Sequence, residues 1–415
     1  MASIFKSMDI CKIFRLIILI VILAPATTGL SYTLEPAIMF VNDTREIIRF
    51  ETDIGSNCTV EYGTTLTYGT NISDNTSDRL HEIVIDGLRA GTEYYYGVDI
   101  QSGNDTNNEF NASFVTSNRD KTSFVFAVLG DSRPASGPLM HEVFGTLINL
   151  IENKNPDFIV MTGDDVKLSD VGIISRDEAV SYWGGFINVT KSIMKTKPFF
   201  TAVGNHDRPD QTEALKRFQE VFLHPHNGNG EMGYFNETTY WFEYGNSLFV
   251  VLNTEEPNYT SNIGGNQLTW LNETIRRTGY THKFVFTHRP IRGSTRKTMI
   301  NANLIDSIFW ENNVTAIFAG HNHLYCYYTT HDNLLYITAG GAGAKLHTRR
   351  CAGTGISTHH YVLVSVTNNT IIGTVYDASD IEIANFSRSI QATEKKTYYA
   401  SFLISWNLLS LPLLL

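Results

Sequence analysis

Five apolar runs along this chain each end at a short polar block rich in Asp, Asn and His. The runs are Phe124 to Leu129, Phe158 to Met161, Phe199 to Val203, Phe284 to Phe286 and Ala316 to Ala319. The blocks are Gly130-Asp131, Gly163-Asp164, Gly204-Asn205-His206-Asp207, Thr287-His288 and Gly320-His321-Asn322-His323. Short apolar runs of this kind predict buried strands, so each block is expected directly after a strand. Because loops at the carboxyl ends of strands in an open α/β sheet share one crevice, the blocks are expected to meet.

The side chains of these blocks form a mixed set of metal ligands. Carboxylate and amide oxygens combined with imidazole nitrogens suit iron, manganese or zinc rather than calcium, which takes oxygen ligands. Two such ions about 3.5 to 4 Å apart can acidify a water molecule and stabilise the attacking and leaving oxygens of a phosphoryl group. We therefore expect two transition-metal ions, with hydroxide rather than a side chain as the nucleophile.

The blocks differ in specificity. A Gly-Asp pair after a strand is usually only a turn. The block Gly204 to Asp207 is more specific, because it places an amide ligand beside a His that a carboxylate can orient as a general acid. In Gly320 to His323, two imidazoles lie two residues apart and can reach neighbouring metals from an extended backbone. His288 alone is more typical of a core residue, and its place in the series supports it as a ligand.

From Thr122 onwards the pattern alternates between predicted strands and helices. A helix is predicted between the first two blocks, with an apolar face formed by Leu139, Val143, Leu147 and Ile151 and by Phe144 and Ile148 beside them. The resulting βαβ unit brings Asp131 and Asp164 to the same sheet edge. Later strands suggest a second sheet facing the first: Trp241 to Glu243, Leu248 to Leu252, Leu335 to Ala339 and Tyr361 to Thr367.

The region before Thr122 has a different pattern. Short β-prone stretches separated by turn residues predict a β-sandwich, and they are Glu46 to Glu51, Thr59 to Tyr62, Glu82 to Ile85, Glu93 to Asp99 and Asn111 to Thr116. The segment Gly87 to Tyr94 resembles the tyrosine corner of a fibronectin type III domain, in which the Tyr hydroxyl bonds back to the preceding turn. Asn118 to Lys121 is expected to be a linker.

Both ends of the chain carry apolar segments. Lys6, Lys12 and Arg15 precede the apolar run Leu16 to Ala24, which indicates a secretory signal, with an uncleaved membrane anchor as the alternative. The run Ala400 to Leu415 resembles a cleaved lipid-anchor signal with Ser387 or Ser389 as the attachment residue. A short tail anchor and an ordinary buried strand are the alternatives for this run.

Export agrees with two further features. Asn-x-Ser/Thr acceptors are frequent, at Asn42, Asn57, Asn71, Asn75, Asn104, Asn111, Asn188, Asn236, Asn258, Asn272, Asn313, Asn368 and Asn385. In an oxidising compartment Cys326 and Cys351 are candidates for a disulfide, which would leave Cys58 unpaired.

A formal net charge of -10 argues against general nucleic-acid binding, because a phosphate backbone needs a basic face.

On the residues of the five blocks, the chain resembles the calcineurin-like metallophosphoesterases, and together with its N-terminal region it looks like a purple acid phosphatase. The resemblance implies that Asp131 and His323 serve a first metal and that Asp164 bridges. It implies that Asn205, His288 and His321 hold a second metal and that His206 protonates the leaving group. Asp207 is expected to orient His206, a role inferred from its residue type.

The chain departs from this family at two positions. The wider family usually has a His two residues after its first Asp, where this chain has Arg133, and a guanidinium cannot ligate a metal. The purple enzymes use a Tyr three residues after the second Asp, where Lys167 stands. We expect weaker or exchangeable binding of the first metal and no tyrosinate-to-iron colour.

The basic residues near the blocks leave alternatives open. Arg133 is a candidate clamp for substrate phosphate, with a structural ion pair as the alternative. The cluster Arg289, Arg292, Arg296 and Lys297 is a candidate anion-attracting group or a solvated loop.

The sequence therefore predicts an α+β protein with an N-terminal β-sandwich and a four-layer α/β/β/α domain. The expected boundaries are a signal peptide at 1–30, a fibronectin type III-like domain at 31–118, a metallophosphoesterase domain at 119–378 and a spacer with a hydrophobic tail at 379–415. The expected function is hydrolysis of a small phosphate ester by a secreted or surface-anchored glycoprotein. The alternatives are an exported nucleotidase or phosphodiesterase, and an inactive binding or adhesion protein.

Overall fold

The computed structural model of this chain describes residues 29–228, 237–256, 259–295, 299–330 and 333–390. Most of the predicted signal peptide and the whole apolar run at 400–415 lie outside these residues, so the two predictions stay untested. Among the described residues, no helix is both long enough and apolar enough to cross a membrane. Ser387 and Ser389, the candidate attachment residues, lie in the final strand of the described chain.

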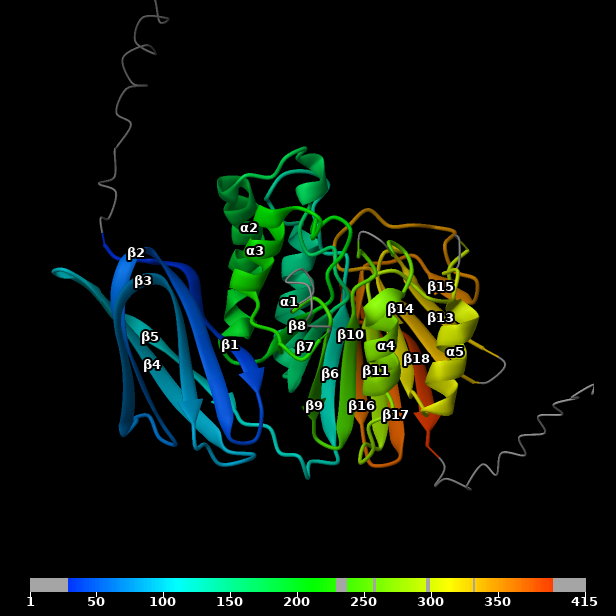
Figure 1. Ribbon diagram of the computed structural model, residues 1–415, viewed down its shortest axis with the longest axis horizontal. Helices are drawn as coiled ribbons and strands as arrows, with labels where there is room; N and C mark the ends of the chain where they lie inside the picture. Colours follow the sequence, from blue (N-terminus) through cyan, green and yellow to red (C-terminus); the bar gives the residue numbers. More distant parts are fainter. Residues whose placement is uncertain (1–28, 229–236, 257–258, 296–298, 331–332, 391–415) are drawn as a thin grey trace, which may run out of the picture.

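Five N-terminal strands form one hydrogen-bonded sheet (Figure 1). They are β1 (Tyr32–Val41), β2 (Arg45–Gly63), β3 (Thr70–Asp86), β4 (Glu93–Ser102) and β5 (Asp105–Val115). The long strand β2 pairs with β3 on one edge and with β1 and then β4 on the other, and register shifts between Glu51 and Cys58 interrupt its ladder with β3. The predicted strands are present, but the separate sheets of a sandwich are not confirmed, because the bulged β2 joins all five strands.

The rest of the described chain contains two larger sheets. A six-stranded sheet has the order β18 (Glu382–Ser389), β17 (Thr370–Asp377), β16 (His360–Val366), β6 (Phe124–Leu129), β7 (Phe158–Met161), β8 (Phe199–Thr201). A seven-stranded sheet has the order β15 (Thr354–Ile356), β13 (Tyr325–Thr329), β14 (Leu335–Ala339), β12 (Ala316–Ala319), β11 (His282–Thr287), β10 (Ser247–Leu252), β9 (Tyr240–Tyr244). Strands β6, β7 and β8 run parallel, as do β10, β11, β12 and β14.

The alternation of side chains along the strands creates four layers. In β6, Phe126 and Val128 pack between the two sheets, whereas Ala127 and Leu129 face the helices α1 (Glu142–Lys154), α2 (Arg176–Met194) and α3 (Thr212–Val221). In β10, Phe249 packs between the sheets, and its neighbours face α4 (Gly265–Thr274) and α5 (Ala302–Glu311). Phe126 meets Phe284 of the opposite sheet edge-on, with ring centroids 5.2 Å apart. Helix, sheet, sheet and helix therefore stack as predicted, with an aromatic core in the middle.

Two details of the predicted elements are wrong. Leu139 is 84% exposed and precedes α1, whose buried face consists of Phe144, Leu147, Ile148 and Ile151. The strand predicted at Tyr361 to Thr367 joins the first sheet rather than the second, because β16 pairs antiparallel with β6. The predicted βαβ unit is confirmed, since β6 and β7 are parallel neighbours joined through α1.

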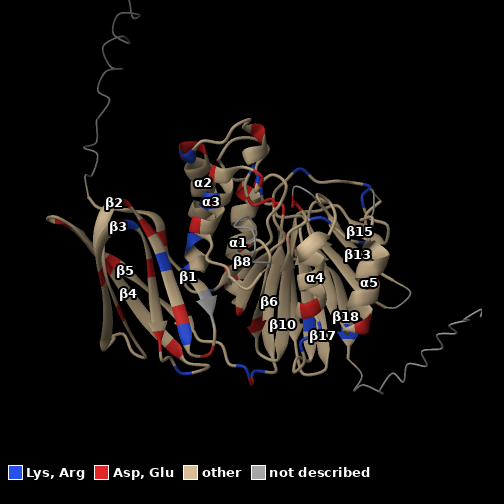
Figure 2. Ribbon diagram, viewed as in Figure 1, with Lys and Arg blue, Asp and Glu red and all other residues tan. Residues whose placement is uncertain are grey.

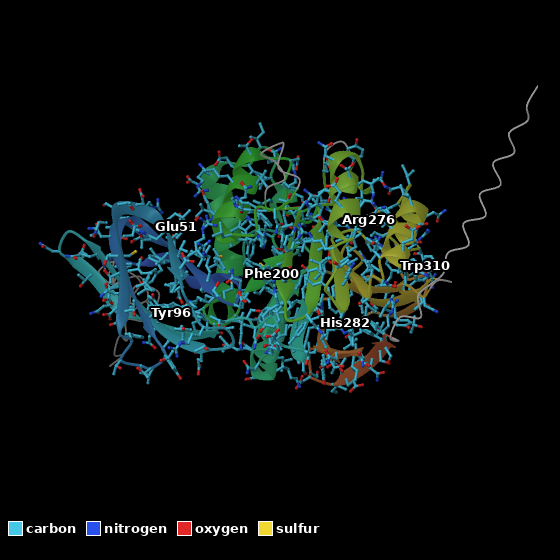
Figure 3. The ribbon with its side chains drawn as sticks, turned by 60° about the horizontal axis from the view of Figure 1, so that its bottom comes forward. Glu51, Tyr96, Phe200, Arg276, His282 and Trp310 are labelled. Atoms are coloured by element: carbon cyan, nitrogen blue, oxygen red, sulfur yellow. A yellow bond between two sulfur atoms is a disulfide. The ribbon has the colours of Figure 1, made fainter. Side chains whose placement is uncertain are left out.

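Polar contacts join the N-terminal sheet to the helices of the larger domain. The buried hydroxyl of Tyr96 donates to the carbonyl oxygen of Lys195 at the end of α2, at 2.8 Å. Arg217 of α3 donates to Glu51 of β2 at 2.7 Å, with both side chains almost fully buried. Glu51 and Tyr96 are labelled in Figure 3, together with Phe200 of β8 in the larger domain. Because such buried polar groups are costly to separate, these contacts favour a fixed docking of the sheet on α2 and α3.

The cysteines agree with the sequence prediction. Cys326 and Cys351 form a disulfide, and Cys58 is a buried free thiol. The sulfur of Cys58 lies 3.7 Å from Nδ1 of His81, which also contacts a carboxylate oxygen of Asp74 at 2.9 Å. Burial raises the pKa of the Cys58 thiol to about 12, so this thiol is protonated at neutral pH.

The predicted tyrosine-corner hydrogen bond is present, because the backbone N–H of Arg89 donates to the hydroxyl oxygen of Tyr94 at 3.0 Å. We predict that Tyr94→Phe lowers the free energy of unfolding by about 1 kcal/mol, since it leaves a backbone donor without this partner. Denaturant unfolding measures the change. Tyr95→Phe is the matched control, because the Tyr95 hydroxyl makes only an exposed contact with Glu93. An equal loss in both variants would contradict the prediction.

Candidate metal centre

The five polar blocks lie at one edge of the two sheets, as the sequence predicts. Strands β6, β7 and β8 of the first sheet and β11 and β12 of the second are each followed by one block. Figure 2 shows charged residues among the loops above these strands. Asp131, Asp164 and His321 all have left-handed backbone, with φ of 60°, 57° and 63°. Non-glycine residues in this conformation are uncommon and gather at functional sites, where the surrounding structure holds them in place.

Four side chains converge on one point, which we call the second position: Asp164, Asn205, His288 and His321. Nε2 of His288 lies 3.3 Å from Oδ1 of Asp164, 3.2 Å from Oδ1 of Asn205 and 3.3 Å from Nδ1 of His321. Two ligands about 2.1 Å from one ion are separated by about 3.4 Å in tetrahedral geometry, so this donor set fits a metal. Nδ1 of His288 donates to the carbonyl oxygen of Thr162 at 2.9 Å, which leaves Nε2 free to bind.

Three side chains converge on a neighbouring point, which we call the first position: Asp131, Asp164 and His323. Oδ1 of Asp131 lies 3.3 Å from Nε2 of His323 and has no hydrogen bond within the described part of the chain. Nδ1 of His323 donates to the carbonyl oxygen of Lys345 at 2.7 Å, so Nε2 is the nitrogen that faces the other candidate ligands. A buried carboxylate oxygen without a partner is costly, and a cation is the group that it would accept. The two positions share Asp164, which is the arrangement of a bridging ligand.

Asp164 is buried among cationic and hydrogen-bonding groups. Burial alone would raise its pKa, but His288, His206 and Arg133 outweigh burial and hold the pKa at about 2. Oδ1 of Asp164 also accepts the backbone N–H of His206 at 2.8 Å. The carboxylate is therefore ionised at neutral and mildly acid pH, as a metal ligand must be.

Arg133 and Lys167, the two basic residues at which the sequence was expected to depart from the family that it resembles, differ in where they point. Nε of Arg133 donates to Oδ2 of Asp164 at 3.3 Å, and Nη2 lies 3.5 Å from Nε2 of His323. The ammonium of Lys167 contacts the carbonyl oxygen of Ala135 and pairs with Asp170 at 3.2 Å. Arg133 thus belongs to the first position, in the ion pair that the sequence left as an alternative, whereas Lys167 is held by the neighbouring loop.

The expected contact between Asp207 and His206 is replaced by another arrangement. The carboxylate of Asp207 accepts three backbone N–H groups, from Gly204 at 2.7 Å and from Asp164 and Val166 at 3.0 Å each. Nδ1 of His206 contacts the hydroxyl of Ser169 instead. Asp207 therefore ties two polar blocks together, and Ser169 is the side chain in position to orient His206.

The pKa values of His206 and Asp207 follow from their burial. Burial lowers the pKa of His206 to about 4, against the opposing attraction of Asp164. Burial also raises the pKa of Asp207 well above its usual range, with the charges of Asp165 and Asp164 adding to the effect.

Besides Ser169, sequence reasoning missed three side chains that line this centre. Asp165 is fully buried, accepts from Thr201 at 2.7 Å, and has its pKa raised to about 8 by burial and then by neighbouring carboxylates. The ring of His347 stacks on His323 with centroids 4.1 Å apart. Glu255 binds Arg289 through two hydrogen bonds of 2.6 and 2.8 Å. The Asp164-Asp165 doublet was a visible signal for the first, but nothing local in the sequence marks the other two.

The predicted anion-attracting cluster is divided by these contacts. Arg289 is paired with Glu255, and its Nη1 lies 3.3 Å from Nε2 of His321. Arg292 pairs with Asp306 at 2.8 Å. Arg296 and Lys297 lie outside the described residues. The two described residues of the cluster, Arg289 and Arg292, are therefore both paired with carboxylates. Arg289 also contacts His321, a candidate ligand.

We predict that Asn205→Ala lowers metal content by about one ion per chain, because the amide oxygen is one of only four donors at the second position. Elemental analysis of purified protein measures the ratio. Asn108→Ala, in the exposed part of β5, is the control and should leave metal content unchanged. Retention of the full metal content by Asn205→Ala would rule out Asn205 as a ligand.

Comparisons with known proteins place this centre in a family. Residues 124–325 match the profile of the calcineurin-like phosphoesterase family. A phosphoenolpyruvate phosphatase from Allium cepa is 23% identical over 284 residues, which cover 64% of this chain and 54% of that protein. The chain thus spans about half the length of this curated relative.

Two solved structures share the fold. A purple acid phosphatase from yellow lupin (Lupinus luteus) seeds has a TM-score of 0.70 at 15% identity, covering 88% of this chain and 75% of that one. The structure of PhoD has a TM-score of 0.66 at 12% identity, covering 89% and 95%. The fold, the shared carboxylate and the family match agree: residues 124–325 of this chain form a calcineurin-like phosphoesterase domain.

Proposed function

We propose that this chain is a metal-dependent hydrolase of phosphate esters. The observation that carries the proposal is the convergence of Asp164, Asn205, His288 and His321, which come from four different strand ends and lie around one point. A metal ion held there would activate water and neutralise charge on the phosphoryl oxygens. A small phosphate ester is the proposed substrate, in agreement with the phosphatase relatives.

The protein's own residues supply binding and proton transfer in this proposal. Asp164 serves both metal positions, and Asp131 and His323 complete the first. His206 is the proposed proton donor to the leaving oxygen, because its partly exposed ring places Nε2 3.9 Å from Oδ2 of Asp164. Since burial lowers the pKa of this ring to about 4, the protonated form that donates is abundant only in acid, so this role implies that activity rises as the pH falls towards 4. The hydroxyl of Ser169 contacts Nδ1 of the same ring, so this contact holds the ring with Nε2 directed towards Asp164.

The direct test is turnover of aryl phosphate monoesters and diesters by the purified full chain, with and without added manganese, zinc or iron. Hydrolysis that a chelator abolishes and metal restores supports the proposal. Preference for diesters or nucleotides would identify an exported phosphodiesterase or nucleotidase. Metal-free, inactive protein would instead support the binding or adhesion alternative.

The role of His206 gives a sharper prediction. We expect His206→Ala to lower kcat by roughly 100-fold or more for an alkyl phosphate, because the departing alkoxide needs a proton. The loss should be much smaller for p-nitrophenyl phosphate, whose leaving group is stable as an anion. His226→Asn is the control, since that exposed ring pairs with Glu237. Equal losses on both substrates would exclude proton donation by His206.

We also propose that the protein is exported and glycosylated. All acceptor asparagines within the described residues are exposed or partly exposed, as attachment of a glycan requires. We predict that protein produced in a eukaryotic secretory host loses apparent mass when N-glycans are removed enzymatically. Electrophoresis before and after treatment measures the shift, and unchanged migration would refute glycosylation in that host.

A further inference from the structure

Arg133 lies inside the ligand group of the first position. Its Nε is 3.3 Å from Oδ2 of Asp164 and its Nη2 is 3.5 Å from Nε2 of His323, so the guanidinium spans two of the three candidate ligands. The side chain is 14% exposed, and the backbone N–H of the same residue donates to the carbonyl oxygen of Asp164 at 3.0 Å. Main chain and side chain of Arg133 therefore both attach to the Asp164 loop.

The distances from the guanidinium nitrogens of Arg133 to Asp164 and His323 equal those expected between two ligands of one metal ion. Asp131 and His323, which would share the first metal, are separated by 3.3 Å between Oδ1 and Nε2. The guanidinium nitrogens stand at nearly the same separation from Asp164 and His323, and so they take up a place in the coordination shell. An arginine N–H group has no free electron pair and the guanidinium stays protonated. A metal ion in that shell would therefore meet a positive charge at contact distance.

The first position nevertheless keeps an attraction for cations. Oδ1 of Asp131 is buried, points towards His323 and has no hydrogen bond among the described residues. The other oxygen, Oδ2, is already engaged by the backbone N–H of His321 at 2.7 Å. Arg133 contacts Asp164 and His323, so one carboxylate oxygen of the position is left for an incoming ion.

We propose that Arg133 is an internal competitor of the first metal ion. The guanidinium takes a ligand's place beside Asp164 and His323 and puts a positive charge at contact distance from the ion, so the ion binds only when the guanidinium moves away. The second position, with four side-chain donors, fills first, and the first position fills only after the guanidinium moves out. This inference rests on the proposed metal-dependent function, and it concerns the order and strength of metal binding rather than the reaction.

Two substitutions separate competition from the simple absence of a ligand. Arg133→Ala removes the positive charge and adds no donor, whereas Arg133→His removes the charge and restores an imidazole. If the position only lacks a ligand, Arg133→Ala should bind the first ion no better than the unmodified chain. If Arg133 competes, Arg133→Ala should bind it about tenfold more tightly or better, because a charge at contact distance is removed.

The experiment is calorimetric titration of the metal-stripped full chain with manganese, with ion content checked by elemental analysis. The unmodified chain should show one tight ion and a second bound at least about tenfold more weakly, a difference of roughly 1.4 kcal/mol. Arg133→Ala should narrow that gap, and Arg133→His should narrow it further. Arg119→His, at an exposed surface pair with Glu243, is the control and should behave like the unmodified chain.

Binding at the second position serves as the check that each variant is folded. If Arg133→Ala loses that binding, Arg133→Met, which keeps an apolar side chain of similar reach, takes its place. Equal tight binding of two ions by the unmodified chain would overturn the proposal. So would improvement in Arg133→His without any in the Ala or Met variant. If the unmodified chain binds no metal and shows no turnover, the proposed function itself is contradicted. That result differs from the two outcomes above, which concern only the competition between Arg133 and the first ion.

Discussion

The buried carboxylate of Asp164 is the constraint on which the rest of the centre depends. It is shared by both metal positions, and its ionised form is held by His288, His206 and Arg133 despite complete burial. Its backbone lies in the left-handed region, and its N–H donates to Asp207. A neighbouring glycine, Gly204, has its backbone so close that any larger residue there would collide with Asp164. The loops after β7 and β8 are therefore built as one unit around a single anionic group.

Much of this arrangement could be predicted from the sequence, because strand ends and ligand types are local properties. Asp131, Asp164, Asn205, His288, His321 and His323 each follow an apolar run, and the parallel strands bring them together as the pattern predicts. The partners of these residues could not be predicted, since they come from elsewhere in the chain. Asp207 was assigned to His206 by sequence neighbourhood, yet three backbone amides from the folded loops bind it. The N-terminal region shows the same limit: its strands were visible, but the bulges that join them into one sheet were not.

Arg133 places a guanidinium beside two candidate ligands of the first position, Asp164 and His323. The guanidinium fits among these ligands and carries a positive charge, so the carboxylate of Asp164, which would bind an ion, pairs with Arg133 instead. Lys167, at the other changed position, is drawn away to Asp170 and leaves the centre unaltered. Two basic replacements in neighbouring loops thus have different consequences, and the difference is set by which carboxylate each can reach.

The disulfide between Cys326 and Cys351 has a consequence for where this centre can mature. It closes a stretch that carries Lys345, whose carbonyl oxygen accepts from the ring of His323, and His347, whose ring stacks on that ring. The side-chain amide of Asn322, beside His323 in sequence, donates to the carbonyl oxygen of Arg350 and to the hydroxyl of Ser294, and these hydrogen bonds join the same loops. The candidate ligands of both positions, His321 and His323 included, lie outside this covalent loop, which instead carries the groups that support the ring of His323. In a chain folded under reducing conditions, the loop that supports His323 would lose this covalent tether, whereas the supports of the second position would be unchanged. Metal occupancy of the first position would then depend on the redox state of the compartment in which the chain folds.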